Sequence, residues 1–139
     1  MYQITNLLCL FLLLIALPLA LSAVEPNLVT AFIQVESAGR DNAIGDHGRA
    51  YGALQIHAHT VTDVNRLYGT KYHLRDMLDR SKAVEVCQKY LAFYGSEKQL
   101  GHLPTTENLA RIWNGGPEGW RHKATAGYWR RVHAQLTLP

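Results

Sequence analysis

Glu36 is the residue whose type and position point most directly to chemistry. It follows Phe32 and Ile33 on the apolar face of an expected helix, and the helix-ending Gly39 comes three positions later. A carboxyl group beside apolar side chains loses hydration, which disfavours the charged form and raises the pKa. Such a group stays protonated near neutral pH and can serve as a general acid. The alternative is a glutamate that ends a helix and turns into solvent.

Two aspartates offer a second carboxylate. Asp41 and Asp46 lie in a glycine-rich stretch, and either could face Glu36 and position a water for an inverting hydrolysis. The competing interpretation, favoured by the sequence, is that Asp46 is a turn residue bonded to its own backbone, because Gly45 and Gly48 flank it closely.

Two further groups invite a chemical interpretation. His57 and His59 could bind a metal on an extended segment, but no cysteine or acidic ligand stands beside them. We therefore expect histidines on the surface or in a cleft, with no metal and no cofactor. Cys87 shares an apolar stripe with Val84 and Leu91, which predicts a buried, inert thiol.

The elements that must position these residues are mostly helices. Apolar residues recur at spacings of three and four in five segments, each bounded by glycine, proline or a polar starting residue. The segments are residues 26–39, 60–68, 79–95, 104–115 and 124–136. Three glycines predict a loop or small hairpin over residues 40–53, and strand patterns are nearly absent elsewhere. The fold class is thus mainly α, with about five short helices.

Four short motifs occur in order along this helical framework. They are Glu36–Gly39, Gly52–Ile56, Ala110–Gly116 and Tyr128–Val132. Together they resemble the lysozyme-like lytic transglycosylases of the SLT family, which are related to goose-type lysozymes. The resemblance extends from about Val24 to Leu136, and it implies a single lysozyme-like domain.

The resemblance assigns a role to five residues besides the acid. It implies that Ser37 lines the substrate cleft, that Gln55 and Asn114 contact the saccharide, and that Tyr128 lies near the catalytic carboxylate. Trp113 stands where the family usually has tyrosine. That position loses a hydroxyl and keeps a ring that can stack on sugar or pack in the core.

The mechanism that the resemblance implies uses one carboxyl group twice. Glu36 protonates the glycosidic oxygen between N-acetylmuramic acid and N-acetylglucosamine. The resulting carboxylate then assists attack by the muramoyl C6 hydroxyl, which produces a 1,6-anhydro end. The two alternatives are a hydrolytic muramidase on the same scaffold and a non-catalytic protein that binds cell-wall saccharide or assists assembly.

Residues 1–23 differ in composition from the rest of the chain. The 139 residues carry a net charge of +3, yet no charged residue precedes Glu25, and residues 7–21 are almost purely aliphatic. This pattern predicts a secretory signal peptide with small residues near its end, followed by one domain over residues 24–139. We expect a secreted or periplasmic protein, and an uncleaved N-terminal membrane anchor is the alternative.

Composition also bounds the partners. The predicted mature domain holds one cysteine and is long enough for a single core, so we expect a monomer without an internal disulfide. From Lys98 onward, six basic residues stand against two acidic ones, which favours an anionic partner such as a cell-wall polymer or a membrane surface, or else is an ordinary solvated face. The resemblance implies peptidoglycan glycan strands as the partner. No basic run is interleaved with aromatic residues, which argues against nucleic acid. A domain this small could be recruited by a membrane or secretion-apparatus partner.

Overall fold

The computed structural model describes residues 24–138, and the predicted signal peptide lies outside them. Six α-helices account for most of this part: α1 (Pro26–Ser37), α2 (Ala58–Tyr68), α3 (Arg80–Tyr94), α4 (Glu97–Leu100), α5 (Thr106–Gly115) and α6 (Ala126–Leu136). The five helices predicted from sequence correspond to α1, α2, α3, α5 and α6. The mainly α fold class is therefore confirmed.

Short elements account for the differences from prediction. The single turn α4 and the 3-10 helices η2 (Leu74–Leu78), η3 (Gly119–Arg121) and η4 (Lys123–Thr125) were not predicted, because pieces this short have no amphipathic period. Helix α1 ends at Ser37, before the predicted stop at Gly39, because Ala38 already adopts the left-handed conformation with φ of 53°.

The Gly-rich segment forms a small antiparallel sheet, as the sequence predicted in part. Strand β1 (Ile44–Gly45) pairs with β2 (Ala50–Tyr51), and the 3-10 helix η1 (Asp46–Gly48) connects them. A third strand, β3 (Ile56–His57), pairs with β2 and lies beyond the predicted hairpin. It leads directly into α2, so the sheet is joined to the start of that helix without a loop.

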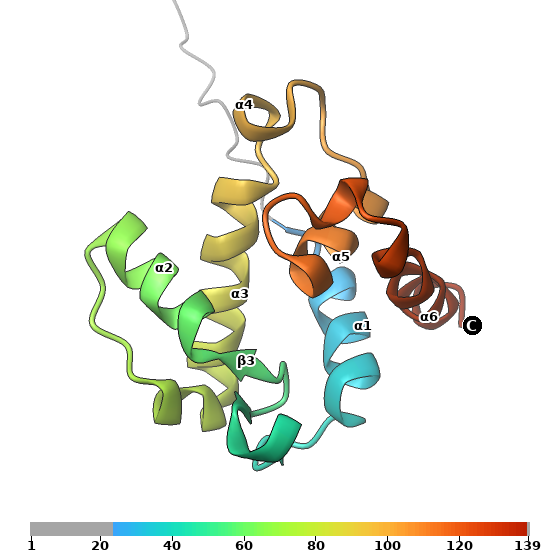
Figure 1. The fold of residues 1–139 in the computed structure, drawn as a ribbon. Coiled ribbons are helices and arrows are strands. Elements are labelled where there is room, and N and C mark those ends of the chain that lie inside the picture. The colour runs from blue at the N-terminus through green and yellow to red at the C-terminus, as the bar shows by residue number, and fades with distance from the viewer. Residues whose placement is uncertain (1–23, 139) are drawn as a thin grey trace, which may run out of the picture.

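Figure 1 shows how the helices are arranged. Helix α3 runs through the middle of the molecule, with α2 packed along one side. Helix α5 contacts α3, α1 and α6, while α6 also packs against α1. The small sheet lies at one end, between α1 and α2. The C-terminal ends of α1 and α5 and the N-terminal end of α2 therefore meet around a common space.

A continuous apolar core supports this arrangement. Phe32 of α1 is fully buried and stacks on Trp113 of α5, with ring centroids 6.0 Å apart. Cys87 of α3 is also fully buried, and burial raises the pKa of its thiol well above the ordinary value, which fits the predicted inert role. No helix within residues 24–138 is long and apolar enough to cross a membrane.

Candidate active site

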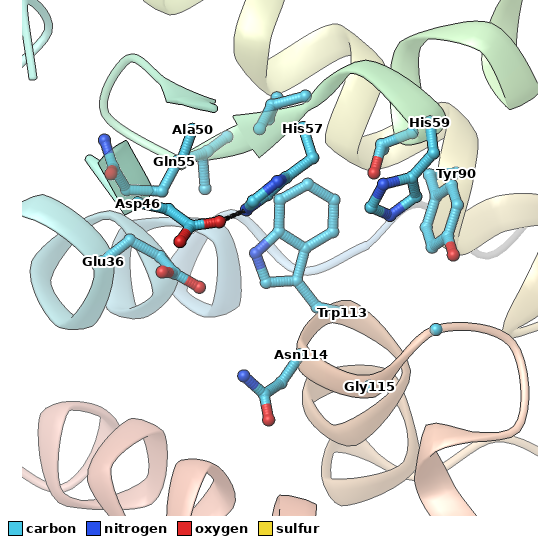
Figure 2. Close-up of a pocket in the computed structure, with 14 residues that line it drawn as sticks. Glu36, Asp46, Ala50, Gln55, His57, His59, Tyr90, Trp113, Asn114 and Gly115 are labelled. Atoms are coloured by element: carbon cyan, nitrogen blue, oxygen red, sulfur yellow. Dashed lines mark ion pairs between the residues drawn. The ribbon is translucent and has the colours of Figure 1, made fainter. Parts of the chain in front are cut away.

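A pocket of about 500 Å³ lies where α1, the small sheet, α2 and α5 meet, and Figure 2 shows the side chains around it. Its walls come from the end of α1, the small sheet, the start of α2 and the end of α5. The residues whose side chains define it are Glu36, Asp46, Gln55, His57, His59, Thr60, Tyr90, Trp113 and Asn114. Five of these were singled out from sequence as candidate site residues: Glu36, Asp46, Gln55, Trp113 and Asn114.

Glu36 occupies the last turn of α1, with its carboxyl group at the pocket wall. Burial raises its pKa above the ordinary value of 4.5. Three weaker influences lower the pKa again: a hydrogen bond from Tyr128, the positive charge of Arg131, and the Trp113 indole. The net direction is upward. The carboxyl group therefore resists ionisation, and its charged form still has stabilising partners. A general acid that gives up a proton and later regains it needs both properties.

Tyr128 lies behind Glu36. Its hydroxyl donates a hydrogen bond of 2.9 Å to Oε1 of Glu36, and its side chain is only 3% exposed. Burial and the neighbouring Glu36 raise the pKa of Tyr128, so the hydroxyl remains a protonated donor. The Arg131 guanidinium lies 5.5 Å from the centre of the tyrosine ring. Tyr128 is not among the residues that line the pocket, and its geometry is that of a positioning residue.

The two candidate second carboxylates have different locations. Asp46 lines the same pocket as Glu36, whereas Asp41 does not and instead forms an ion pair of 2.7 Å with Arg80. Asp46 does lie in a turn, with φ of 47°, but its side chain pairs with other side chains. Its Oδ1 accepts a hydrogen bond of 2.8 Å from Arg49, and its Oδ2 lies 3.7 Å from Nε2 of His57 (Figure 2). The hydrogen bond from Arg49 lowers the pKa of Asp46, so this carboxylate is ionised.

Ser37 does not line the pocket, contrary to the expectation from sequence. Its side chain is 4% exposed, and its hydroxyl donates to the carbonyl of Ala53 at 2.8 Å. The hydroxyl also accepts a hydrogen bond of 3.0 Å from the Arg40 backbone. Ser37 therefore ties the end of α1 to the turn that follows β2. Helical periodicity turns Ser37 by about 100° from Glu36, and here that rotation directs its hydroxyl to the carbonyl of Ala53.

Gln55 lines the pocket, but its side-chain amide bonds to the backbone of the Gly-rich segment. Its Nε2 donates hydrogen bonds to the carbonyls of Gly52, at 2.9 Å, and Ala43, at 3.3 Å. Its backbone adopts a left-handed conformation with φ of 47°. The side chain thus holds the Gly-rich segment in shape next to Glu36, and its Oε1 lies beside Gly45, where a Cβ would collide with it.

Trp113 and Asn114 close the pocket from α5. Trp113 lines the pocket and also packs against Phe32 and, edge-on, against Tyr90, while its stacking on sugar stays a prediction. Asn114 is exposed at the pocket rim. Tyr90 and Thr60 also line the pocket and were not predicted, since neither belongs to a motif that the sequence marks. No group of three or more potential metal ligands occurs within residues 24–138.

Comparison with known proteins identifies the class. The chain matches the family described as "Transglycosylase SLT domain" over residues 18–119. This match covers more than half of the chain, so the protein belongs to that lysozyme-like family.

Known relatives and one solved structure point the same way. "Lysozyme 1" of Crassostrea virginica is 50% identical over 48 residues, which cover 34% of this chain and 25% of that protein. "Lysozyme" of Magallana gigas is 59% identical over 29 residues, 21% of each chain. The chain thus spans a quarter or less of the curated relatives it matches. A chain in the crystal structure of Aeromonas hydrophila PliI in complex with Meretrix lusoria lysozyme superposes with a TM-score of 0.68 and 26% identity, over 80% of this chain and 89% of that one.

Proposed function

We propose that this protein is a glycosidase that cleaves the β-1,4 bond between N-acetylmuramic acid and N-acetylglucosamine in peptidoglycan. The observation that carries the proposal is Glu36, a carboxyl group with a raised pKa at the wall of a pocket. A second helix supplies the hydroxyl that holds it in place. Membership of the lysozyme-like SLT family supports the substrate class.

In the first step Glu36 protonates the glycosidic oxygen as the bond to the anomeric carbon breaks. The glutamate leaves this step as a carboxylate. The Tyr128 hydroxyl donates to one of its oxygens, and the nearby positive charge of Arg131 favours the same charged form. The environment therefore holds the proton before the step and stabilises the charge after it.

The position of Asp46 in the pocket favours hydrolysis over transglycosylation as the second step of the reaction. Most glycoside hydrolases use a pair of carboxyl groups, one protonated and one ionised, on either side of the scissile bond. Here Glu36 has a raised pKa and Asp46 a lowered one, and both line one pocket. The ionised Asp46 either activates a water or stabilises the positive charge that develops on the sugar. We therefore place the hydrolytic muramidase ahead of the lytic transglycosylase.

The lytic transglycosylase remains the second candidate, because Glu36 has the partners needed to act twice. As a carboxylate it would take the proton from the muramoyl C6 hydroxyl, giving a 1,6-anhydro end without added water. A non-catalytic saccharide-binding protein would keep the pocket without needing the carboxyl group of Glu36.

Digestion of purified peptidoglycan, with mass spectrometry of the fragments, separates these candidates. We expect reducing ends heavier by one water than anhydro ends, and Glu36→Gln should lower the rate by about 10³-fold. Anhydromuramoyl products would overturn hydrolysis in favour of transglycosylation. Bound glycan with no cleavage over a range of pH would overturn the enzymatic proposal.

The anomeric configuration of the first product, followed by NMR, then assigns the role of Asp46. Inversion corresponds to a water activated by the aspartate, and retention to an aspartate that bonds to the sugar.

We also propose that residues 1–23 direct export. N-terminal sequencing of the exported protein tests this, and an intact Met1 would contradict removal of the segment.

A further inference from the structure

His57 lies where the small sheet meets helix α2, and it faces the proposed second carboxylate. It is the last residue of β3 and the N-cap residue of α2, and it lines the pocket. Its Nε2 atom lies 3.7 Å from Oδ2 of Asp46. Figure 2 shows the carboxyl group of Asp46 directed toward the ring of His57, on the same side of the pocket as Glu36. The proposed reaction assigns no role to His57.

The register of the sheet creates this contact. Gly45 pairs with Ala50, and Ala50 pairs in turn with His57, so the three residues form one row across the strands. Directly paired residues of an antiparallel sheet present their side chains on the same face. Ala50 and His57 both line the pocket, and Asp46 follows Gly45 immediately in the chain. The strand pairing therefore brings the His57 ring and the Asp46 carboxylate to the same face of the sheet.

Asp46 is held from two directions. Arg49 donates a hydrogen bond of 2.8 Å to Oδ1 of Asp46 and another, of 3.1 Å, to the backbone carbonyl of the same residue. The Arg49 side chain is exposed and is not among those that line the pocket. His57 is the partner on the pocket side, next to Oδ2. Without His57, the strongest remaining interaction of the carboxylate is with Arg49, outside the pocket.

A protonated imidazole at this position attracts the carboxylate. Histidine carries a positive charge under mildly acidic conditions and loses it as the pH rises. The titratable groups that share the pocket with His57 are Asp46 from η1, Glu36 from α1, His59 from α2 and Tyr90 from α3. A charge on His59, whose ring lies 5.6 Å away, would oppose one on His57, and the Asp46 carboxylate counters that repulsion. Mild acidity therefore strengthens the hold on Asp46.

The positive charge of His57 also affects the acidity of Asp46. The hydrogen bond from Arg49 is the largest cause that lowers the pKa of Asp46, and the charges of Arg49, His57 and His47 lower it further. A charged neighbour on the pocket side thus helps to keep this carboxyl group ionised.

We infer that His57 is a positioning residue that keeps the carboxylate of Asp46 turned into the pocket, with a hold that protonation of the imidazole strengthens. This inference rests on the proposed function, since it concerns the second carboxylate of the same reaction. His57 needs no contact with the substrate for this role, because it acts through Asp46.

The pH dependence of kcat/KM, measured on the full chain, tests this role. The proposed hydrolysis requires ionised Asp46, so activity rises as the pH rises through the pKa of Asp46. His57→Gln removes a positive charge that lowers this pKa, so the acid limb should move to higher pH by about half a pH unit. His57→Lys keeps a positive charge and should leave the acid limb near its native position. The alkaline limb, which Glu36 controls, should stay in place in both variants.

A double substitution shows whether His57 acts through Asp46. Near about pH 5, where histidine is ordinarily charged, His57→Gln should lower kcat about tenfold and change KM by less than about twofold. In a chain that carries Asp46→Asn, the same change should cost less than about twofold, because the carboxylate that His57 holds is already gone. His133→Gln, on α6 and outside the pocket, is the matched control and should leave both limbs in place. The His57 side chain does not cap α2, so its replacement should leave the fold intact, which circular dichroism checks.

Three results would overturn the inference: an acid limb that stays in place in His57→Gln, a loss confined to KM, or an equal loss with and without Asp46→Asn. Cleavage of peptidoglycan by the native chain would in each case leave the proposed glycosidase standing. Anhydromuramoyl products together with full activity of Asp46→Asn would likewise refute the positioning role alone. Absence of cleavage by the native chain over a range of pH would refute both.

Discussion

The hydroxyl of Tyr128 donates a 2.9 Å hydrogen bond to Oε1 of Glu36, joining two residues 92 positions apart in the chain. The tyrosine comes from the first turn of α6 and the glutamate from the last turn of α1, and these helices pack against each other. The bond orients the buried carboxyl group and, together with Arg131 and Trp113, favours its charged form. The position and the acidity of Glu36 thus both depend on the α1–α6 interface.

Tyr128→Phe should shift the pH dependence of activity. The hydrogen bond from Tyr128 lowers the pKa of Glu36, so its removal raises that pKa further. Activity requires protonated Glu36 and falls as the pH rises through its pKa, so the alkaline limb of kcat/KM should move to higher pH. The maximal rate should fall about tenfold, because the carboxylate formed after proton transfer loses a donor.

Tyr94→Phe is the matched control for that measurement. Its hydroxyl donates a hydrogen bond of the same 2.9 Å length to Asp63, outside the pocket. We expect an unchanged pH profile for this variant. An alkaline limb that stays in place in Tyr128→Phe would show that the tyrosine does not tune the acid.

Glu36→Gln should stabilise the protein at neutral pH. Burial raises the pKa of Glu36 in the folded state above 4.5, so its ionisation works against folding. This penalty is absent below the unfolded pKa and complete above the folded pKa. Thermal unfolding should therefore give a Tm a few degrees higher for the variant at pH 8, with the difference vanishing near pH 4. A lower Tm at pH 8 would contradict the unfavourable burial.

Asp46→Asn should lower kcat about 100-fold if Asp46 is the second carboxylate, because asparagine cannot supply the negative charge. Asp41→Asn removes a carboxylate from the neighbouring loop segment without touching the pocket, and its activity should stay within about twofold. Both variants are assayed on the same peptidoglycan with product analysis. Full activity of Asp46→Asn would favour a reaction that Glu36 completes alone.

Ser37→Ala should destabilise the fold by about 1–3 kcal/mol, because the buried carbonyl of Ala53 loses its donor. Thr30→Ala is the comparison in the same helix. Its hydroxyl donates to the carbonyl of Pro26 at an exposed site, and the change should cost less than about 0.5 kcal/mol. Urea unfolding measures both. Equal stability of Ser37→Ala and the native chain would refute the structural role.

Gly52→Ala should cost more than about 3 kcal/mol, whereas Gly48→Ala should cost about 1–2 kcal/mol. Both glycines have positive φ, +77° and +84°. A Cβ at Gly52 would collide with the Met77 carbonyl, while one at Gly48 meets nothing within 4 Å. Thermal unfolding of the soluble protein, or recovery in the soluble fraction when a variant fails to fold, ranks the two. Similar losses would show that the backbone conformation alone decides the cost.

The helices were predictable because their evidence is local. Apolar residues at spacings of three and four mark one face of a helix, and Pro26, Gly69 and Gly95 mark ends that the structure confirms within a few residues. The short 3-10 helices and the two-residue strands were missed or only partly predicted, since a segment of two to five residues carries no period. Their conformations depend on the helices around them.

The candidate site, like the fold, was predictable only where the evidence is local. The sequence by itself determined the helical framework, the family and the position of Glu36 at the end of an apolar helical face. Only the tertiary structure decided that Asp46 enters the pocket while Asp41 pairs with Arg80, and that Ser37 is buried. The physical reason is that periodicity specifies which face of a helix is apolar. The distance between side chains on separate elements depends instead on how those elements pack, as the contact between Glu36 and Tyr128 illustrates.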